Sequence, residues 1–245
     1  MRTAPLSARS VVTSSGPTEK WAASTWVVIA AYNEASIIGE VIRGLKRLSH
    51  KVIVIDDGSS DETQSEAVSA GALVVRHCIN LGQGAALQTG IDCALANGAR
   101  FMATFDADGQ HSPEDVVAML ERMEETSSDA ALGSRFLGSA LGLDPWRRRL
   151  LQAAVIFQRW TTGAELTDVH NGLRVFRDEA IRKCKIRQNR MAHASEIIYC
   201  IVSNNIKFVE VPCTIRYTPY SRSKGQRLTS AARIVLDLMI RRMYR

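Results

Sequence analysis

One apolar run that ends in two acids decides the fold: Lys51-Val52-Ile53-Val54-Ile55-Asp56-Asp57-Gly58-Ser59. A strand that is apolar at every position has both faces covered, as in a parallel sheet wrapped by helices. Similar runs recur on both sides of it and alternate with amphipathic stretches. The predicted strands span 26–30, 51–55, 72–76 and 100–105, and the predicted helices 36–48, 61–70 and 84–97. The first half therefore predicts a doubly wound α/β domain with helices on both faces of the sheet.

The second half of the chain is less regular. Strands are predicted at 129–133, 173–176 and 207–211, and helices at 145–160, 194–203 and 229–243. Residues 1–24 are rich in Ser, Thr, Ala and Arg, and Pro5, Gly16 and Pro17 interrupt any periodicity, so a disordered tail is predicted there. The chain thus divides into a tail at 1–24, one folded domain at 25–215, and a basic loop with an amphipathic helix at 216–245.

The composition is typical of a soluble globular protein, with 46% hydrophobic and 23% charged residues. There is no apolar run of about eighteen residues and no apolar secretory signal, so a location on the cytoplasmic side is expected. The five cysteines are widely spaced without a Cys-x-x-Cys pair. Neither a zinc site nor a disulfide is predicted, and the cysteines are expected to be reduced and mostly buried.

Polar clusters follow all four strands predicted in the first half. In open parallel sheets, ligands bind beyond the carboxyl ends of the strands. The clusters are Tyr32-Asn33-Glu34, Asp56-Asp57-Gly58-Ser59, Asn80-Leu81-Gly82-Gln83-Gly84 and Asp106-Ala107-Asp108-Gly109-Gln110. Because each cluster is predicted at the same edge, the sequence predicts one site there.

The pair Asp106 and Asp108 is the candidate metal site. Two carboxylates two residues apart at a strand end can point to one side, and with phosphate oxygens they can hold a hard divalent cation. Gln110 could add a neutral oxygen ligand. Such a cation would stabilise a departing nucleoside diphosphate. An Asp-x-Asp alone is a weak signal, since solvated pairs at strand ends are common.

Two other clusters have a structural alternative beside the functional one. The stretch 56–61 can cap the following helix while a carboxylate accepts bonds from a base or ribose. The glycines at 82 and 84 can admit a diphosphate or sugar, or form a tight turn. The stretch lacks the Gly-Lys-Ser/Thr of a P-loop and does not follow the first strand as a dinucleotide fingerprint does. A kinase or dehydrogenase is therefore not predicted.

As a set, these clusters resemble the family 2 glycosyltransferases of GT-A fold, and specifically the dolichol-phosphate mannose synthase-like branch, which glycosylates polyprenyl phosphates. The resemblance runs from about Trp26 to the C-terminus. Further stretches that carry it are His111 with Pro113-Glu114, Gly133-Ser134-Arg135, Thr167-Asp168, Gly172-Leu173-Arg174-Val175-Phe176, Val209-Glu210-Val211-Pro212 and Ser223-Lys224-Gly225.

The resemblance implies roles for individual residues. Tyr32, Glu34 and Asp57 would contact the nucleoside. Asp106, Asp108 and Gln110 would hold Mg²⁺ or Mn²⁺, and Arg135 would lie near the transferring and acceptor phosphates. The whole set predicted to bind the donor is Ala30, Tyr32, Glu34, Asp57, Gly84, Asp106 and Ala107. Ala30 is a departure, because the family usually has proline there, and the loss of its fixed φ loosens the expected base pocket.

The acceptor decides whether a protein base is needed. A phosphate acceptor is already anionic and needs only orientation, whereas a sugar hydroxyl needs a base within hydrogen-bond reach. The candidate bases are Asp168, His170, His193 and Glu196. The predicted catalytic set is Asp108, Arg135, Asp168 and Glu196, although loop acids are often turn formers and Glu196 could simply cap its helix.

The net charge of +6 is concentrated near the C-terminus. From residue 216 onward Asp237 is the only acid, against Arg216, Arg222, Lys224, Arg227, Arg233, Arg241, Arg242 and Arg245. Together with the basic, aromatic stretch 146–160, this favours a peripheral position on an anionic inner membrane face. The alternative is ordinary helix packing. A nucleic-acid partner is not predicted, because the strand ends are acidic.

The resulting hypothesis is an inverting transfer of a hexose from UDP- or GDP-hexose to a polyprenyl phosphate. The alternative within enzymes is transfer to a saccharide hydroxyl in cell-surface polysaccharide assembly, with Asp168 or Glu196 as base. A non-catalytic sugar-nucleotide-binding protein is a further alternative, which the intact acidic pair disfavours. A small membrane-spanning partner that anchors the chain is an additional hypothesis.

Overall fold

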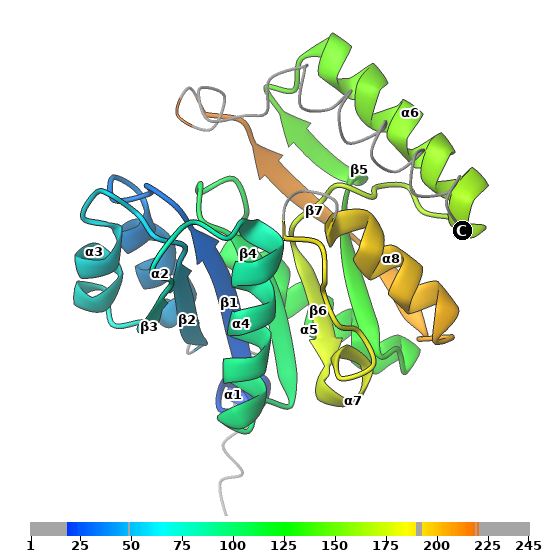
Figure 1. Ribbon diagram of the computed structural model, residues 1–245. Coiled ribbons are helices and arrows are strands. Elements are labelled where there is room, and N and C mark those ends of the chain that lie inside the picture. The colour runs from blue at the N-terminus through cyan, green and yellow to red at the C-terminus, as the bar shows by residue number, and fades with distance from the viewer. Residues whose placement is uncertain (1–18, 49, 190–192, 219, 221–245) are drawn as a thin grey trace, which may run out of the picture.

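A computed structural model describes residues 19–48, 50–189, 193–218 and 220 (Figure 1). In these ranges the chain forms a seven-stranded sheet in the order β3-β2-β1-β4-β6-β5-β7. The strands are β1 (Thr25–Ala31), β2 (Lys51–Asp56), β3 (Leu73–Arg76), β4 (Phe101–Asp106), β5 (Ala130–Leu141), β6 (Arg174–Arg177) and β7 (Phe208–Arg216).

All strands but one run in the same direction. β1 pairs in parallel with β2 and β4, β2 pairs in parallel with β3, and β5 pairs in parallel with β7. β6 lies between β4 and β5 and is antiparallel to both. The predicted α/β class with a mostly parallel sheet is therefore confirmed.

Helices cover both faces of the sheet (Figure 1). They are α1 (Glu19–Ala22), α2 (Ile38–Arg47), α3 (Thr63–Ser69), α4 (Gln83–Ala96), α5 (Pro113–Thr126), α6 (Pro145–Thr162), α7 (Asp178–Ile181) and α8 (His193–Ser203). Successive residues of a strand point to opposite faces. Accordingly Val27 packs with Leu45 of α2 and Met119 of α5 in one buried cluster, whereas Val28 packs with Ile91 of α4 and Ile198 of α8 in the other.

Several elements differ from the sequence prediction, and the short α7 is one that was not predicted. α5 was not predicted, although Pro113 stands at its start and Val116, Met119, Leu120 and Met123 are buried at helical spacing. β5 extends to Leu141, beyond the predicted 129–133, because it pairs with β7 across a register shift between Ser134 and Ser139.

The prediction of disorder needs a correction for the residues just before β1. Residues 19–22 form α1, in which Trp21 is buried and Lys20 forms an ion pair with Glu124 of α5. Burial of the indole and a contact to a distant helix hold this turn on the domain. Residues 1–18 and the predicted helix at 229–243 lie outside the described residues.

The cysteine prediction needs a correction. Cys184 and Cys200 form a disulfide, with their Cα atoms 5.6 Å apart. Cys184 follows α7 and Cys200 lies on α8, so the pair depends on tertiary packing, which the sequence spacing does not reveal. Of the free cysteines, Cys213 is buried as expected, but Cys78 is exposed.

None of the helices that the structure describes has the length and apolar character that a bilayer crossing requires.

The contact of α4 with the sheet predicts an effect on stability. A Cβ at Gly90 would lie 2.2 Å from Cγ1 of Val28, so Gly90→Ala overpacks the core. We expect the free energy of unfolding in urea to fall by about 1–3 kcal/mol. The control is Gly39→Ala, where the near neighbour is the flexible Arg43 side chain. That helical substitution should be neutral or stabilise by up to about 1 kcal/mol. Equal effects of the two changes would contradict this packing.

Candidate active site

The ends of β1, β2 and β4 meet at one edge of the sheet. In the parallel register Ala31 is opposite Asp56, and Ala30 is opposite Asp106. The loops that begin with Tyr32, Asp57 and Ala107 therefore leave the sheet side by side. The side chains of Ala30 and Ala107 face the two cores, so only their backbone is available to a ligand at this edge.

The loops after β1 and β2 are tied together by hydrogen bonds. The Asn33 amide donates to Oγ of Ser59 (2.9 Å), and the Ser60 amide donates to Oδ1 of Asn33 (2.9 Å). The Glu34 amide donates to Oγ1 of Thr63 (2.8 Å). Asn33 has a φ of 55°, which asparagine tolerates better than most residues. These bonds leave the Tyr32 ring exposed and Glu34 largely buried.

Asp57 holds the loop after β3. Its carboxylate accepts the amides of Leu81 (2.9 Å) and Gly82 (2.7 Å) and lies 2.7 Å from Nδ1 of His77. A carboxylate has about four acceptor positions, so about one remains for a nucleoside. The structure thus gives Asp57 a task in addition to the predicted base contact.

Gly84 does not face open space. A Cβ there would lie 1.8 Å from the carbonyl oxygen of Gln188, and its amide donates to the carbonyl of Asn189 (3.0 Å). This packing agrees with the tight turn that the sequence left open for this stretch, and a donor contact at Gly84 stays a prediction. This position needs glycine because the segment after α7 packs against the start of α4.

The carboxylate of Asp106 lies at the centre of the edge. It accepts Nε2 of Gln83 (3.3 Å) and is 3.1 Å from Nε2 of His111. A Cβ on Gly172 would lie 2.3 Å from its Oδ2, so glycine leaves the space that the carboxylate fills. Asp108 follows two residues later, and its Oδ1 accepts the Gln110 amide (3.1 Å).

The two carboxylates have different electrostatic surroundings. Burial opposes ionisation of Asp106, but the hydrogen bond from His111 and the nearby charges of His111, His193 and Arg174 outweigh it, so its pKa is lowered. Burial, and next the charge of Asp106, raise the pKa of Asp108 to about 6. Negative charge is thus concentrated at this edge.

The residues present fit a hard cation shared with a ligand. Among the described residues, no cluster of three or more His, Cys, Asp or Glu side chains could bind a metal ion by itself. Asp106 and Asp108 nevertheless offer hard oxygen donors, and a shell completed by phosphate oxygens and water needs only one or two carboxylates. The Gln110 backbone holds this loop in place, because its carbonyl accepts the amide of Arg216 (3.0 Å).

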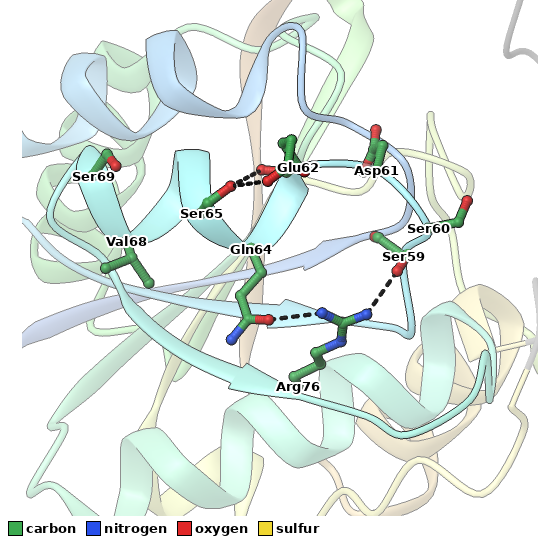
Figure 2. Close-up of a pocket in the computed structure, with 9 residues that line it drawn as sticks. All are labelled: Ser59, Ser60, Asp61, Glu62, Gln64, Ser65, Val68, Ser69 and Arg76. Atoms are coloured by element: carbon green, nitrogen blue, oxygen red, sulfur yellow. Dashed lines mark hydrogen bonds between the residues drawn. The ribbon is translucent and has the colours of Figure 1, made fainter.

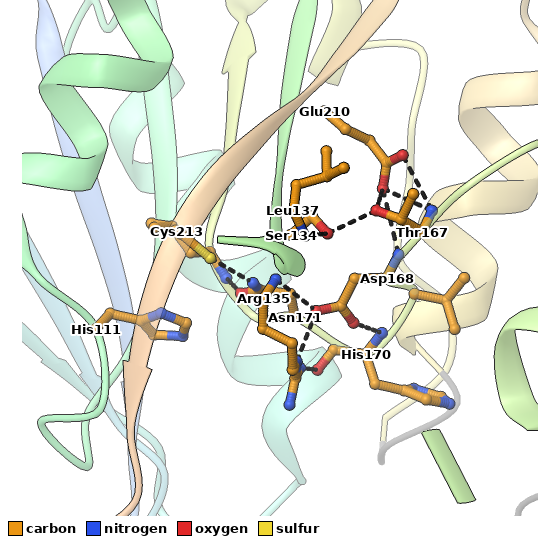
Figure 3. A network of polar contacts seen from close by, with 12 residues as sticks. His111, Ser134, Arg135, Leu137, Thr167, Asp168, His170, Asn171, Glu210 and Cys213 are labelled. Atoms are coloured by element: carbon orange, nitrogen blue, oxygen red, sulfur yellow. Dashed lines mark hydrogen bonds and ion pairs between the residues drawn. The ribbon is translucent and has the colours of Figure 1, made fainter. Parts of the chain in front are cut away.

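Arg135 is the centre of a buried polar network beside the acidic edge (Figure 3). Its Nε donates to Oδ2 of Asp168 (2.6 Å), Nη1 to the hydroxyl of Tyr217 (2.6 Å) and Nη2 to the carbonyl of His170 (2.9 Å). The guanidinium is therefore fixed in a single orientation. Burial by itself would lower the pKa of Arg135. The interactions with Asp168 and Tyr217 outweigh this effect and raise the pKa, so the guanidinium keeps its positive charge.

Glu210 of β7 holds the loop that carries Asp168. Its carboxylate accepts the amides of Thr167 (2.9 Å) and Asp168 (3.2 Å) and the hydroxyl of Thr167 (2.9 Å). The Thr167 hydroxyl also lies 2.6 Å from that of Ser134 (Figure 3). The quoted motifs around residues 134, 167 and 210 thus form one network.

The predicted bases have other tasks in this structure. Asp168 pairs with Arg135, and Glu196 accepts the amides of Arg187 (3.0 Å) and Gln188 (2.9 Å). Burial lowers the pKa of His170 to about 4, so this imidazole is neutral at pH 7. His193 is buried against Gly84, and its charge acts on Asp106. In this structure Asp168 and Glu196 thus hold the chain, and their role as proton acceptors stays a prediction.

Arg174 of β6 received no role from the sequence. It is buried, and its Nη2 donates to the carbonyl of Val169 (3.2 Å). Burial lowers its pKa to about 10, while the charges of Asp106 and Asp168 oppose this, so it remains a cation at pH 7. The available signal was an arginine directly between apolar residues, Leu173 before it and Val175 and Phe176 after it, because buried arginines are rare unless they are paired.

A separate groove of about 550 Å³ lies beside α3 (Figure 2). Arg76 spans it, with Nη1 donating to Gln64 (2.8 Å) and Nη2 to the carbonyl of Ser59 (2.8 Å). Its lining includes neither Asp57 nor the acidic pair, so we do not assign it to the candidate site.

Comparison with known proteins identifies relatives of the chain. The family model described as glycosyl transferase family 2 matches residues 26–185. The UDP-N-acetylglucosamine–dolichyl-phosphate N-acetylglucosaminyltransferase of Methanococcus voltae is 28% identical, over 89% of this chain and 96% of the relative. The polyprenol monophosphomannose synthase of Mycolicibacterium smegmatis is 29% identical, over 89% of this chain and 87% of the relative.

A solved structure supports the same fold. Glucosyl-3-phosphoglycerate synthase from Mycobacterium tuberculosis, in complex with Mn²⁺, UDP-glucose and phosphoglyceric acid, superposes with a TM-score of 0.63 at 18% identity. The match covers 89% of this chain and 79% of that chain. At this identity the likeness concerns the fold.

The close approach of Gly172 to Asp106 predicts an effect on cation binding. Gly172→Ala would place a methyl group within 2.4 Å of both carboxylate oxygens and displace them. We expect the Kd for Mn²⁺, measured by calorimetry in the presence of UDP, to rise by more than about tenfold, because the cation would lose one of its carboxylate ligands. The Gly39→Ala protein, whose added methyl group meets only the flexible Arg43 side chain, should bind as the unchanged chain does. Equal Mn²⁺ affinity in all three proteins would rule out a cation site at Asp106.

Proposed function

We propose a function from one established premise: the chain belongs to glycosyl transferase family 2. It is a glycosyltransferase, and its fold is the GT-A fold expected from the sequence. The proposed reaction is inverting transfer of a hexose from a nucleotide sugar to a polyprenyl phosphate at the cytoplasmic face of a membrane. Two relatives that match nearly the whole chain are named for polyprenyl-linked sugar synthesis. They are named for different sugars, so the proposal specifies the acceptor class and not the hexose.

The acidic edge is the observation that carries this proposal. Asp106 ends β4 beside the loops of β1 and β2, Asp108 follows in the next loop, and Gly172 leaves room for the Asp106 carboxylate. We expect Mg²⁺ or Mn²⁺ to be held here by Asp106, Asp108 and Gln110, and the cation would supply Lewis-acid stabilisation of the departing diphosphate. Tyr32, Glu34 and Asp57 would contact the nucleoside from the neighbouring loops.

The tasks of the candidate bases favour a phosphate acceptor. Asp168 and Glu196 are both occupied in holding the chain, and His170 is not tuned to accept a proton near pH 7. A phosphate acceptor needs no base, only orientation. Among the described residues, three of the roughly five guanidinium donors of Arg135 are engaged. The remaining donors suit a phosphate oxygen, which arginine recognises well.

A donor screen tests the proposed reaction. The release of UDP or GDP is measured from a panel of nucleotide sugars, with Mn²⁺ and with or without polyprenyl phosphate. The expected result is release that depends on the lipid and yields product in the organic phase. Asp108→Ala should reduce the rate by at least about a hundredfold, because stabilisation of the leaving charge is lost. Asp92→Ala, on the exposed side of α4, is the matched control and should keep full activity.

Two outcomes would contradict this reaction. Product found only in saccharide would favour transfer to a sugar hydroxyl, the alternative from the sequence. Full activity of Asp108→Ala would remove the acidic pair from the mechanism altogether.

α6 supports the proposed membrane position. Trp146, Ile156 and Trp160 are 59%, 70% and 70% exposed. They fall within about 80° of one another around the helix at about 100° per residue. The exposed Arg148 and Arg149 lie on the same helix, while Val155 packs on the core. An apolar stripe beside basic residues suits the surface of an anionic bilayer. A small membrane-spanning partner remains a prediction from the sequence.

Flotation with liposomes checks this position. The chain should float with anionic vesicles, less at high salt, and not with neutral ones. Reversing Arg148 and Arg149 to Glu should lower the bound fraction by at least about tenfold, since each basic residue near the surface contributes about 1 kcal/mol. The same charge change at the exposed Arg43 and Arg47 of α2 is the control. Equal loss in both variants would mean that net charge, rather than α6, directs binding.

A further inference from the structure

The chain that leaves β7 crosses the candidate site. In β7 the residues Val211, Cys213 and Ile215 are buried, and the alternate positions are more exposed. Tyr217 continues this alternation, so its ring belongs to the buried cluster on the α5 face of the sheet while its hydroxyl reaches Arg135. We call residues 216–218 together with Tyr220 the strap.

The strap contacts the loop after β4 first. The amide of Arg216 donates to the carbonyl of Gln110 (3.0 Å), and the amide of Tyr217 donates to the carbonyl of Leu141 (3.0 Å). The strap thereby joins the loop that carries Asp108 to the end of β5. Backbone hydrogen bonds at both residues hold Tyr217 in place beside Arg135.

The second contact is made by the Tyr217 hydroxyl. It accepts Nη1 of Arg135 at 2.6 Å, in a buried position. Together with Asp168 and the His170 carbonyl, it sets the plane of the guanidinium. A rotation of that plane would redirect the donors that face outward from the network.

The third contact is made by Tyr220. Its hydroxyl donates to Oε2 of Glu34 at 2.6 Å, across 186 residues of sequence. Glu34 belongs to the loop after β1, on the nucleoside side of the proposed site. A short bond to a charged carboxylate holds that side chain more firmly than a bond between neutral groups would.

We propose that Tyr217 and Tyr220 are positioning residues with separate tasks. Tyr220 orients Glu34 for the nucleoside of the donor, and Tyr217 orients Arg135 for the phosphate of the acceptor. The strap thereby contacts both half-sites, and each tyrosine serves one of them. This inference rests on the proposed function, because it uses the assigned roles of Glu34 and Arg135.

The test is a split between two Michaelis constants. Initial rates are measured with donor and polyprenyl phosphate varied in turn, for the unchanged chain, Tyr217→Phe and Tyr220→Phe. Each change removes one hydroxyl that bonds a charged group, which corresponds to about tenfold in binding. Tyr220→Phe should raise the KM for the nucleotide sugar about tenfold and leave the KM for the lipid unchanged. Tyr217→Phe should raise the KM for the lipid about tenfold and leave the KM for the nucleotide sugar unchanged. Tyr199→Phe, on the exposed side of α8, is the control for loss of a tyrosine hydroxyl.

Other results separate the strap from the proposed reaction. Suppose that the unchanged chain transfers sugar. If each variant then changes both KM values equally, or if neither variant changes either KM value, the strap inference is overturned while the proposed reaction stands. If the unchanged chain transfers no sugar, the reaction fails, and calorimetry with UDP or GDP and Mn²⁺ decides the strap. Weaker nucleotide binding by Tyr220→Phe alone would then support it. Equal nucleotide binding by the unchanged chain and both variants, or no nucleotide binding by the unchanged chain, would overturn the strap inference.

Discussion

The parallel pairing of β1 with β2 and β4 is the constraint on which the site depends. Backbone hydrogen bonds set Ala31 opposite Asp56 and Ala30 opposite Asp106, so three polar loops begin at one edge. The register in turn depends on two cores, because a slip of one residue would move Val27 and Val28 to the wrong faces. Packing on both sides of the sheet therefore determines where the carboxylates stand.

Charge at this edge is balanced by buried partners. Arg135 compensates Asp168, while Arg174 and His111 act on Asp106. Burial makes an unpaired charge costly, so each of these groups restricts where the others can go. The same contacts explain why Asp168 and Glu196 hold the chain in place. A family 2 glycosyltransferase that acts on a lipid phosphate needs oriented cations more than it needs a base.

Much of the fold could be predicted from local sequence signals. Apolar runs give the parallel strands, and even the unpredicted α5 carries a proline start and a helical spacing of buried residues. The acidic pair was recognised from its place after an apolar strand, whereas the role of Arg135 came from the family resemblance, and both stay predictions as site residues. The disulfide between Cys184 and Cys200 and the contact of Gly84 with Gln188 could not, because each joins segments that meet only after the sheet has formed.

The sequence by itself determined the fold class, the acidic edge and the family, since these follow from residue type and spacing along single strands and loops. The tertiary structure decided which polar groups remain available to a ligand. Asp57 is shared with the loop after β3, Arg135 is aligned by Tyr217, and Glu34 is held by Tyr220. The physical reason is that a hydrogen bond depends on where two atoms meet in space, and Glu34 and Tyr220 meet across 186 residues.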